Sequence, residues 1–298
     1  MIAYLFPGQG SQFAGMGHKL STHNPETTRI FHQANEILGF PVSELMCEGT
    51  AEELRQTKVT QPAIFVYSVA LSRCMADRFH PNAAAGHSLG EFSALTACGA
   101  LSFEEGLQLV AARAQAMQSA CDLTPGGMAA IIGLADEEVE RVCAAVTSGI
   151  VVPANYNCPG QVVISGDVKA VAEACTLLKD AGARMTVTLE VGGAFHSPLM
   201  APASDALKTA VEQARIAPPR CAIYQNVTAR PTQDPEVIRE NLLAQLTGAV
   251  RWTQSLQCMF TDGVNSCLEV GPGTVLAGLV KKTNRAVGVE SAACDDIN

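Results

Sequence analysis

Short apolar runs alternate along the chain with longer segments whose apolar residues recur every three or four positions. The first pattern is typical of buried strands and the second of helices with one buried face. Their alternation predicts an α/β fold with a parallel sheet, in which residues 2–6 form a central strand. Further strands are expected at residues 82–85, 222–225 and 264–270. Helices are expected at residues 24–38, 63–75, 91–101, 103–120, 200–212, 235–246 and 275–282, with another beginning at Trp252.

Three of the helical segments carry start signals. Asn24, followed by a proline, is typical of an N-cap. Thr50 and Glu53 have the spacing of a capping box, which predicts a helix beginning there. The dipeptide Gln61-Pro62 is expected to open the helix at residues 63–75, because proline is favoured in a first helical turn.

The stretch from residue 128 to residue 191 has a strand and helix pattern of its own, in the order βαββαβ of a ferredoxin-like unit. Glycine-rich breaks flank it, as at the boundaries of an inserted domain. We therefore expect a ferredoxin-like small domain at residues 125–191 within a discontinuous α/β-hydrolase-like large domain, residues 1–124 and 192–298, with the site in a cleft between them. The small domain's strands are expected at residues 128–134, 151–155, 162–165 and 184–191, and its helices at 136–146 and 168–181.

Composition narrows the class of protein. Of 298 residues, 48% are hydrophobic and 16% are charged, which predicts a globular chain with a sizeable core. The formal charge of -9 argues against a nucleic-acid binder. No signal-peptide pattern and no apolar stretch of transmembrane length occurs, so we expect a cytoplasmic protein with no membrane contact. The 11 cysteines form no C-x-x-C pair, which favours packing residues over a metal site and leaves a catalytic cysteine as a weaker alternative.

Gly86-His87-Ser88-Leu89-Gly90 is a G-x-S-x-G sequence between an expected strand and an expected helix. In that context the serine lies on a sharp turn with its hydroxyl exposed, and the start of the following helix favours nearby negative charge. Ser88 is therefore a candidate nucleophile. A plain surface turn, built from glycine and serine as turn formers, is the alternative.

Two other loops supply candidate partners for Ser88. Gly8-Gln9-Gly10 follows the first strand and lets the backbone approach a bound group closely, which suits either an oxyanion hole or a plain connecting loop. His196 lies in a glycine-rich bend and follows Ser88 in the order of nucleophile-first hydrolase-like folds, which suits a general base. A lone histidine with only a packing role is the alternative, and no triad carboxylate can be chosen from the sequence.

An arginine lies on the apolar stripe of the helix expected at residues 103–120, for which Ser102 is the expected N-cap. Arg113 has the spacing of the core positions Val110 and Met117. A buried cation needs an anionic partner. Spacing alone leaves open a structural salt bridge, a guanidinium that extends to the surface, and a substrate carboxylate.

Several segments form a specific set in a specific order along the chain. They are Phe6-Pro7-Gly8-Gln9-Gly10-Ser11-Gln12, Thr60-Gln61-Pro62-Ala63, Gly86-His87-Ser88-Leu89-Gly90-Glu91, Asn157-Cys158-Pro159-Gly160-Gln161, Phe195-His196-Ser197-Pro198-Leu199-Met200 and Glu269-Val270-Gly271-Pro272-Gly273. Together they resemble the malonyl-CoA:acyl-carrier-protein transacylase family from the first strand to about Lys282.

The resemblance implies a role for each matching residue in the reaction. Ser88 would form a malonyl ester, and His196 would activate it as a base and later protonate the departing thiol. The backbone N–H groups of Gln9 and Leu89 would form the oxyanion hole. Arg113 would bind the malonyl carboxylate, which decides the buried-cation question in favour of substrate.

The resemblance also implies residues that surround these groups. The main-chain carbonyl of Gln245 would orient the histidine, and Gln61, Met117 and Phe195 would contact the substrate. Phe195 is typical of malonyl-selective members, since members that accept methylmalonyl groups have a smaller residue there.

The implied reaction is a ping-pong transfer of malonyl from malonyl-CoA to the phosphopantetheine thiol of an acyl carrier protein, supplying fatty acid synthesis. It requires no cofactor, no metal and no oligomer. A discrete acyltransferase of a polyketide synthase is the main alternative, followed by a serine hydrolase or thioesterase and by a non-catalytic carrier-binding module.

Two departures from the family pattern, Ala114 for a common glycine and Gly193 for a frequent serine, are expected to alter packing and not activity. Carrier proteins of this kind are usually acidic, so basic side chains are candidates for docking them. These are Lys179, Arg184, Lys281, Lys282 and Arg285.

Overall fold

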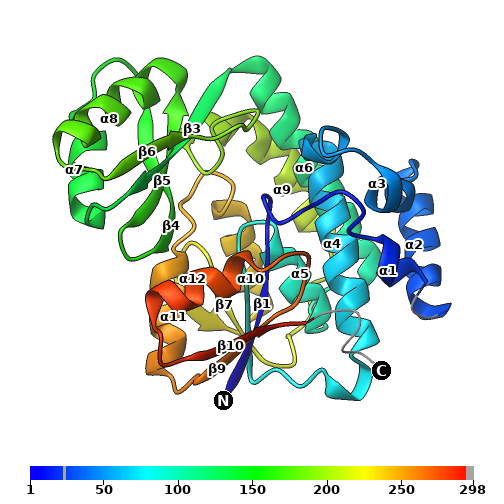
Figure 1. Cartoon of the computed structure of the whole chain (residues 1–298). Coiled ribbons are helices and arrows are strands. Elements are labelled where there is room, and N and C mark those ends of the chain that lie inside the picture. The colour runs from blue at the N-terminus through cyan, green and yellow to red at the C-terminus, as the bar shows by residue number, and fades with distance from the viewer. Residues whose placement is uncertain (23–24, 293–298) are drawn as a thin grey trace.

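A six-stranded sheet forms the centre of the large lobe of the protein (Figure 1). The computed structural model describes residues 1–22 and 25–292, so the expected cap Asn24 lies outside the described residues. The order of the strands in this sheet is β10-β9-β1-β2-β7-β8. Their bounds are β1 Ile2–Phe6, β2 Ala83–Gly86, β7 Ala222–Gln225, β8 Arg230–Thr232, β9 Ser266–Glu269 and β10 Gly288–Ser291.

The central position predicted for β1 is confirmed, since β2 and β9 pair with it in parallel on either side. Alternate residues of β1 enter different cores: Tyr4 and Phe6 face one, whereas Ala3 and Leu5 face the other. A strand covered on both faces must be apolar throughout, which explains its unbroken hydrophobic run. β8 pairs antiparallel with β7 at the edge of the sheet.

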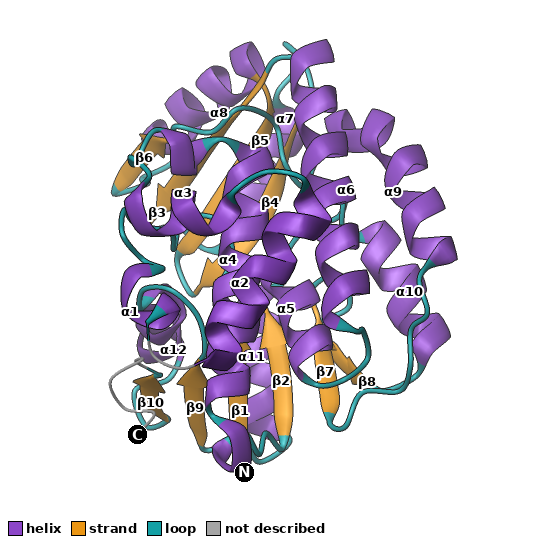
Figure 2. Cartoon of the chain, turned by 90° about the vertical axis from the view of Figure 1, so that its right-hand side faces the viewer, coloured by secondary structure: helices purple, strands orange, loops and turns teal. Residues whose placement is uncertain are grey.

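Helices cover both faces of the large sheet (Figure 2). The core on one face is shared by α2, α4, α5 and α6, and the core on the other face by α11 and α12. The bounds of the large lobe's helices are α1 His18–Ser21, α2 Pro25–Leu38, α3 Val42–Glu48, α4 Thr57–Cys74, α5 Gly90–Ala97, α6 Phe103–Leu123, α9 Ala201–Gln213, α10 Pro235–Ala244, α11 Trp252–Thr261 and α12 Val275–Thr283, with short 3-10 turns at Glu53–Arg55, Ala76–Arg78 and Pro198–Met200.

Two predicted helix limits are wrong. α4 begins at Thr57 and holds Pro62 inside it, because the N–H groups of Val59 and Thr60 bond to the Gln56 carbonyl at 2.7 and 2.8 Å and start the helix upstream. α5 ends at Ala97 and does not continue to residue 101. Gly99 adopts φ +83° there and closes a Schellman-type end, which ordinary side chains resist.

Some short elements were not predicted. β8 and β10 are the edge strands of the large sheet and are largely exposed, so they have no apolar run. α1 and α3, of four and seven residues, are too short for a helical period to become visible. Thr50 and Glu53 do form reciprocal capping bonds, but the segment they cap is a 3-10 turn and not the expected helix. The predicted capping box of α6 at Ser102 is present, with Glu105 as its partner.

The second sheet has four strands in the order β4-β5-β3-β6, with every pairing antiparallel. Together with two helices on one face this is the ferredoxin-like topology expected from the sequence, and the predicted fold class is confirmed. The limits 125 and 191 for an independent domain stay a prediction. The bounds are β3 Gly126–Ile132, α7 Asp136–Ala145, β4 Val151–Cys158, β5 Gln161–Asp167, α8 Val168–Asp180 and β6 Met185–Thr188.

The face of the small sheet opposite α7 and α8 packs toward the large lobe. Met128 and Ala130 of β3 belong to the main core, whereas Ala129 and Ile131 belong to the core under α7 and α8. This period-two alternation turns one face of the small sheet toward the main core, and in Figure 2 the small sheet lies above β1 and β2. Among the described residues, no helix combines the length and apolar character needed to span a bilayer.

The turn between β2 and α5 leaves no room for a side chain at its glycines. A Cβ atom on Gly90 would lie 2.0 Å from the carbonyl oxygen of Phe6. We therefore expect Gly90→Ala to lower the free energy of unfolding by about 3 kcal/mol, measured by urea denaturation. Gly278→Ala is the matched control in α12, where no atom lies within 4 Å, and it is expected to raise stability by up to about 1 kcal/mol. Equal stability of Gly90→Ala and the parent would contradict this account of the turn.

Candidate active site

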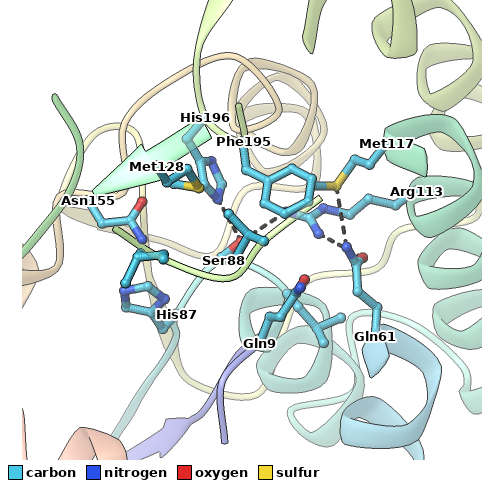
Figure 3. A pocket seen from close by; sticks show the side chains of 13 residues that line it. Gln9, Gln61, His87, Ser88, Arg113, Met117, Met128, Asn155, Phe195 and His196 are labelled. Atoms are coloured by element: carbon cyan, nitrogen blue, oxygen red, sulfur yellow. Dashed lines mark hydrogen bonds between the residues drawn. The ribbon is translucent and has the colours of Figure 1, made fainter. Parts of the chain in front are cut away.

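A pocket lies where the loops after β1 and β2 meet the small sheet (Figure 3). Its walls come from segments far apart in sequence: Gln9 and Ser88 from the loops after β1 and β2, Arg113 from α6, Met128 from β3 and His196 from the loop after β6. The structure thus brings most of the predicted site residues together in one place, and the cleft lies between the two lobes as expected.

Ser88 is at a sharp turn between β2 and α5, with φ +52°. A non-glycine residue adopts this left-handed conformation at a cost of about 1–3 kcal/mol, so the surrounding structure must hold it there. Gly86 and Gly90 permit the turn, because a Cβ on Gly86 would lie 1.8 Å from the carbonyl carbon of Gly90. The strain directs the Ser88 hydroxyl into the pocket (Figure 3).

The Ser88 hydroxyl donates a hydrogen bond to Nε2 of His196, with 2.7 Å between Oγ and Nε2. On its other side Nδ1–H donates to the main-chain carbonyls of Gln245, at 2.9 Å, and Gly248, at 3.2 Å. Because carbonyl oxygens only accept, they fix the tautomer that leaves Nε2 free as a base. The structure therefore places a carbonyl pair where other serine enzymes have a carboxylate.

His196 is electrically unusual. It is 4% exposed, and burial together with the nearby positive charge of Arg113 lowers its pKa to about 3. The main-chain carbonyls act in the opposite direction but are outweighed. The imidazole is thus neutral, and so able to accept a proton, throughout the neutral and mildly acidic range.

Arg113 is 1% exposed, and its guanidinium faces the pocket from α6 (Figure 3). It donates to three neutral acceptors: Gln61 Oε1 at 2.8 Å, Ser88 Oγ at 3.0 Å and Gln245 Oε1 at 3.1 Å. No carboxylate of the described residues forms an ion pair with it. Burial lowers its pKa to about 10, which still leaves it charged at neutral pH.

A buried carboxylate, that of Glu91, supports the turn at Ser88 through Asn226. Glu91 accepts hydrogen bonds from the Asn226 N–H at 2.7 Å and from Gln225 Nε2 at 3.0 Å. Asn226 in turn holds the turn, since its Oδ1 accepts from the Ser88 N–H and its Nδ2 donates to the Gly86 carbonyl, each at 2.7 Å. Burial raises the pKa of Glu91 to about 7, against the effect of these donors.

Two backbone N–H groups at the pocket have no acceptor in the described residues. Gln9 and Leu89 both line it, and within the described residues neither N–H has a hydrogen-bond acceptor. The two loops are close because Gly8 has no side chain: a Cβ there would lie 2.3 Å from the His87 carbonyl oxygen. Unpaired donors beside a nucleophile are what a developing oxyanion requires, so the oxyanion role of Gln9 and Leu89 stays a prediction.

The other predicted contact residues lie on the Arg113 side of the pocket (Figure 3). Gln61 Nε2 lies 3.4 Å from Met117 Sδ, which orients the Gln61 oxygen toward the guanidinium. Phe195 is buried against the main core beside them.

The departure at Gly193 has a packing reason. A Cβ there would lie 2.1 Å from the sulfur of Cys121, so the glycine accommodates that cysteine in α6. For Ala114, which is buried, the structure gives no such reason.

Sequence reasoning missed three polar residues of the site: Glu91, Asn226 and Asn155. Asn226 directly follows β7, a parallel neighbour of β2, and the ends of parallel strands meet at one edge of a sheet. Its position directly after this neighbouring strand could have identified Asn226 as a site residue from the sequence. Glu91 carried only the weaker signal of an acidic residue in a first helical turn.

The ten described cysteines are free, and none of them lines the pocket. Within the described ranges, no three His, Cys, Asp or Glu side chains are grouped to hold a metal ion. The basic residues expected to dock a carrier lie in or next to α8, β6 and α12. Their role stays a prediction.

Comparison with known proteins gives consistent matches over the whole chain. A model of the acyl transferase domain matches residues 3–294. The malonyl CoA-acyl carrier protein transacylase of Bacillus subtilis (strain 168) is 44% identical over 287 residues, covering 95% of this chain and 90% of the relative.

Solved structures agree. The malonyl CoA-acyl carrier protein transacylase of Coxiella burnetii has a TM-score of 0.95 and 37% identity, covering 99% of this chain and 95% of that one. The malonyl-transacylase in a complex with a type II PKS acyl carrier protein has a TM-score of 0.93 and 39% identity, covering 97% and 95%.

The neutral state of His196 can be tested by following imidazole resonances by NMR as a function of pH. We expect its ring to remain unprotonated from about pH 5 to 8, because burial and Arg113 hold its pKa at about 3. In Arg113→Met the pKa should move upward, since a positive neighbour is replaced by an uncharged side chain of similar length. His196→Gln identifies the resonance. Protonation of the parent ring near pH 6.5 would contradict this description of the site.

Proposed function

Since the chain belongs to the malonyl CoA-acyl carrier protein transacylases of the acyl transferase family, we propose that it transfers malonyl from malonyl-CoA to an acyl carrier protein through a malonyl ester of Ser88. The observation that carries the proposal is the Arg113 guanidinium, buried 3.0 Å from Ser88 Oγ among neutral acceptors. Glu91 is near enough to act on this charge but forms no ion pair with it, and a substrate carboxylate would supply that direct pairing.

The first half-reaction uses the groups around Ser88. Its Oγ attacks the thioester carbon while its proton passes to Nε2 of His196, 2.7 Å away. The carbonyl oxygen becomes an oxyanion that accepts hydrogen bonds from the N–H groups of Gln9 and Leu89. The carbon–sulfur bond then breaks, His196 returns the proton to the sulfur, and CoA leaves as a free thiol.

The second half-reaction runs the same steps in reverse order with a different thiol. The phosphopantetheine thiol of the carrier protein gives its proton to His196 and attacks the ester carbon. Collapse of the oxyanion breaks the bond to Ser88 Oγ, which recovers its proton from His196. Malonyl leaves on the carrier as a thioester, and the enzyme is regenerated.

Arg113 connects substrate choice to base strength. In the free site its charge lowers the pKa of His196, which weakens the base. A bound malonyl carboxylate offsets that charge, so the basicity of His196 rises when the correct substrate is present. An acetyl group has no carboxylate and leaves the base weak. The same pairing orients the ester toward the incoming thiol, which favours transfer over hydrolysis.

The carrier protein of fatty acid synthesis is the proposed acceptor. A polyketide carrier protein is the second candidate, because one structural relative is a malonyl-transacylase in complex with a type II PKS acyl carrier protein. We propose no cofactor for the reaction and place it in the cytoplasm. Transfer rates to the two carrier proteins separate the candidates.

The deciding experiment is intact-protein mass spectrometry after mixing with malonyl-CoA and then with holo carrier protein. We expect one malonyl adduct, located on Ser88 by peptide mapping, that the carrier protein discharges faster than water does. Ser88→Ala is the control and should gain no adduct. Absence of an adduct on the parent would overturn the proposal, and discharge by water as fast as by carrier protein would make the enzyme a thioesterase.

Arg113→Met should separate malonyl from acetyl substrates. Loading of malonyl is expected to fall by about a hundredfold or more, because the carboxylate loses its partner in a buried site. Loading from acetyl-CoA should fall less or rise, since the charge that weakens His196 is gone. Burst-phase kinetics of Ser88 acylation measure both, with Arg113→Lys as the variant that keeps the charge. An equal loss for both substrates would return Arg113 to a structural role.

A further inference from the structure

One polar atom at the wall of the pocket has no role in the reaction as described. Asn155, in β4, lines the pocket, and its Oδ1 is buried without a hydrogen-bond partner. Among the buried side-chain oxygens and nitrogens without a partner in the described residues, it alone lines the pocket. Leaving such an atom unpaired costs about 1–3 kcal/mol, so its retention points to a ligand that pairs with it.

The backbone holds Asn155 firmly at this place. β4 has an irregular register between Pro153 and Asn155, and such bulges redirect side chains. On either side, the Tyr156 N–H bonds to the Val250 carbonyl at 2.9 Å and the Val250 N–H bonds to the Ala154 carbonyl at 2.8 Å. The segment around Val250 is the one whose Gly248 carbonyl bonds to the catalytic imidazole.

A second asparagine on the same strand, Asn157, has a side-chain oxygen with a hydrogen-bond partner. Asn157 Oδ1 accepts a hydrogen bond from Nε2 of His87 at 2.9 Å. The two amides are two residues apart, yet only Asn155 lines the pocket. The unpaired oxygen of Asn155 is therefore not a general property of this strand.

Its direction from Ser88 identifies the part of the substrate that it meets. In Figure 3, Arg113 lies on one side of Ser88, and Asn155 lies on the other. When the malonyl carboxylate pairs with Arg113 and the thioester carbon is at Ser88, the sulfur and its substituent must extend toward Asn155. In both substrates that substituent is the pantetheine arm, whose nearest amide N–H is separated from sulfur by two methylene groups.

Resting on the proposed function, we infer that Asn155 Oδ1 accepts a hydrogen bond from this amide N–H of the pantetheine arm. Met128 lines the same pocket, and its unbranched side chain can change rotamer at low cost to open access to Asn155. Because CoA and holo carrier protein share the arm, the contact serves both half-reactions. Hydrolysis of the malonyl ester by water does not use it.

The test compares two small malonyl thioesters that differ in one group, with 2-(acetylamino)ethyl or 2-(acetyloxy)ethyl on sulfur. Only the first has the N–H. We expect the parent to acylate Ser88 about five- to tenfold faster with the amide, as one hydrogen bond predicts. In Asn155→Leu this preference should fall to about onefold, whereas the control Asn157→Ala should keep it. Asn155→Asp, which retains the acceptor, should keep it too.

Several outcomes overturn the inference without affecting the proposed function. No preference in the parent, an unchanged preference in Asn155→Leu, or its loss in Asn155→Asp would each remove Oδ1 as the acceptor. Asn155→Leu should also slow transfer to holo carrier protein but not hydrolysis of the Ser88 ester, and equal slowing of both would indicate a structural effect. Failure of the parent to form any adduct with malonyl-CoA would instead reject the proposed function.

Discussion

The rest of the site depends on one buried positive charge. Arg113 is held inside the protein by Gln61, Ser88 and Gln245, all of which are neutral acceptors. Neutral acceptors satisfy the N–H groups without contributing a negative charge, and Glu91 acts on the guanidinium only from outside ion-pair contact. A charge in a water-poor site acts strongly on its neighbours. It lowers the pKa of His196, donates to the Ser88 hydroxyl and attracts an anionic ligand to the same point.

That arrangement needs a rigid turn, and the contacts that hold the turn are made within the protein and do not involve the substrate. Asn226 bonds to the backbone on both sides of His87, and Glu91 fixes Asn226 from the protein interior. Because Gly86 and Gly90 have no side chains, β2, α5 and the end of β1 approach one another more closely than a Cβ atom would permit. These contacts together maintain the strained φ of Ser88, so the hydroxyl is in position before a ligand binds.

The sequence could predict contacts between residues close together along the chain, but not contacts between residues far apart along it. The turn at Ser88 is local, so five consecutive residues were enough to nominate the serine. Arg113 was visible as a cation on an apolar stripe, but its partner was not, because Gln61 and Gln245 come from 52 residues before it and 132 after it. The resemblance to a family supplied Gln61 as a pocket residue and the Gln245 carbonyl as the group that orients His196, but not the side-chain bonds of either to Arg113. The side-chain roles of Glu91, Asn226 and Asn155 were not predicted.

By itself the sequence determined the alternation of strands and helices, the central place of residues 2–6 and the βαββαβ order of the small sheet, since each follows from hydrophobic period and turn residues. It placed the start of α4 and the end of α5 wrongly, where a neighbouring carbonyl or a left-handed glycine decides. Only the tertiary structure decided which polar groups meet. Hydrogen bonds between Ser88, His196, Arg113 and Asn226 join residues more than 20 positions apart, and no local pattern encodes such a pairing.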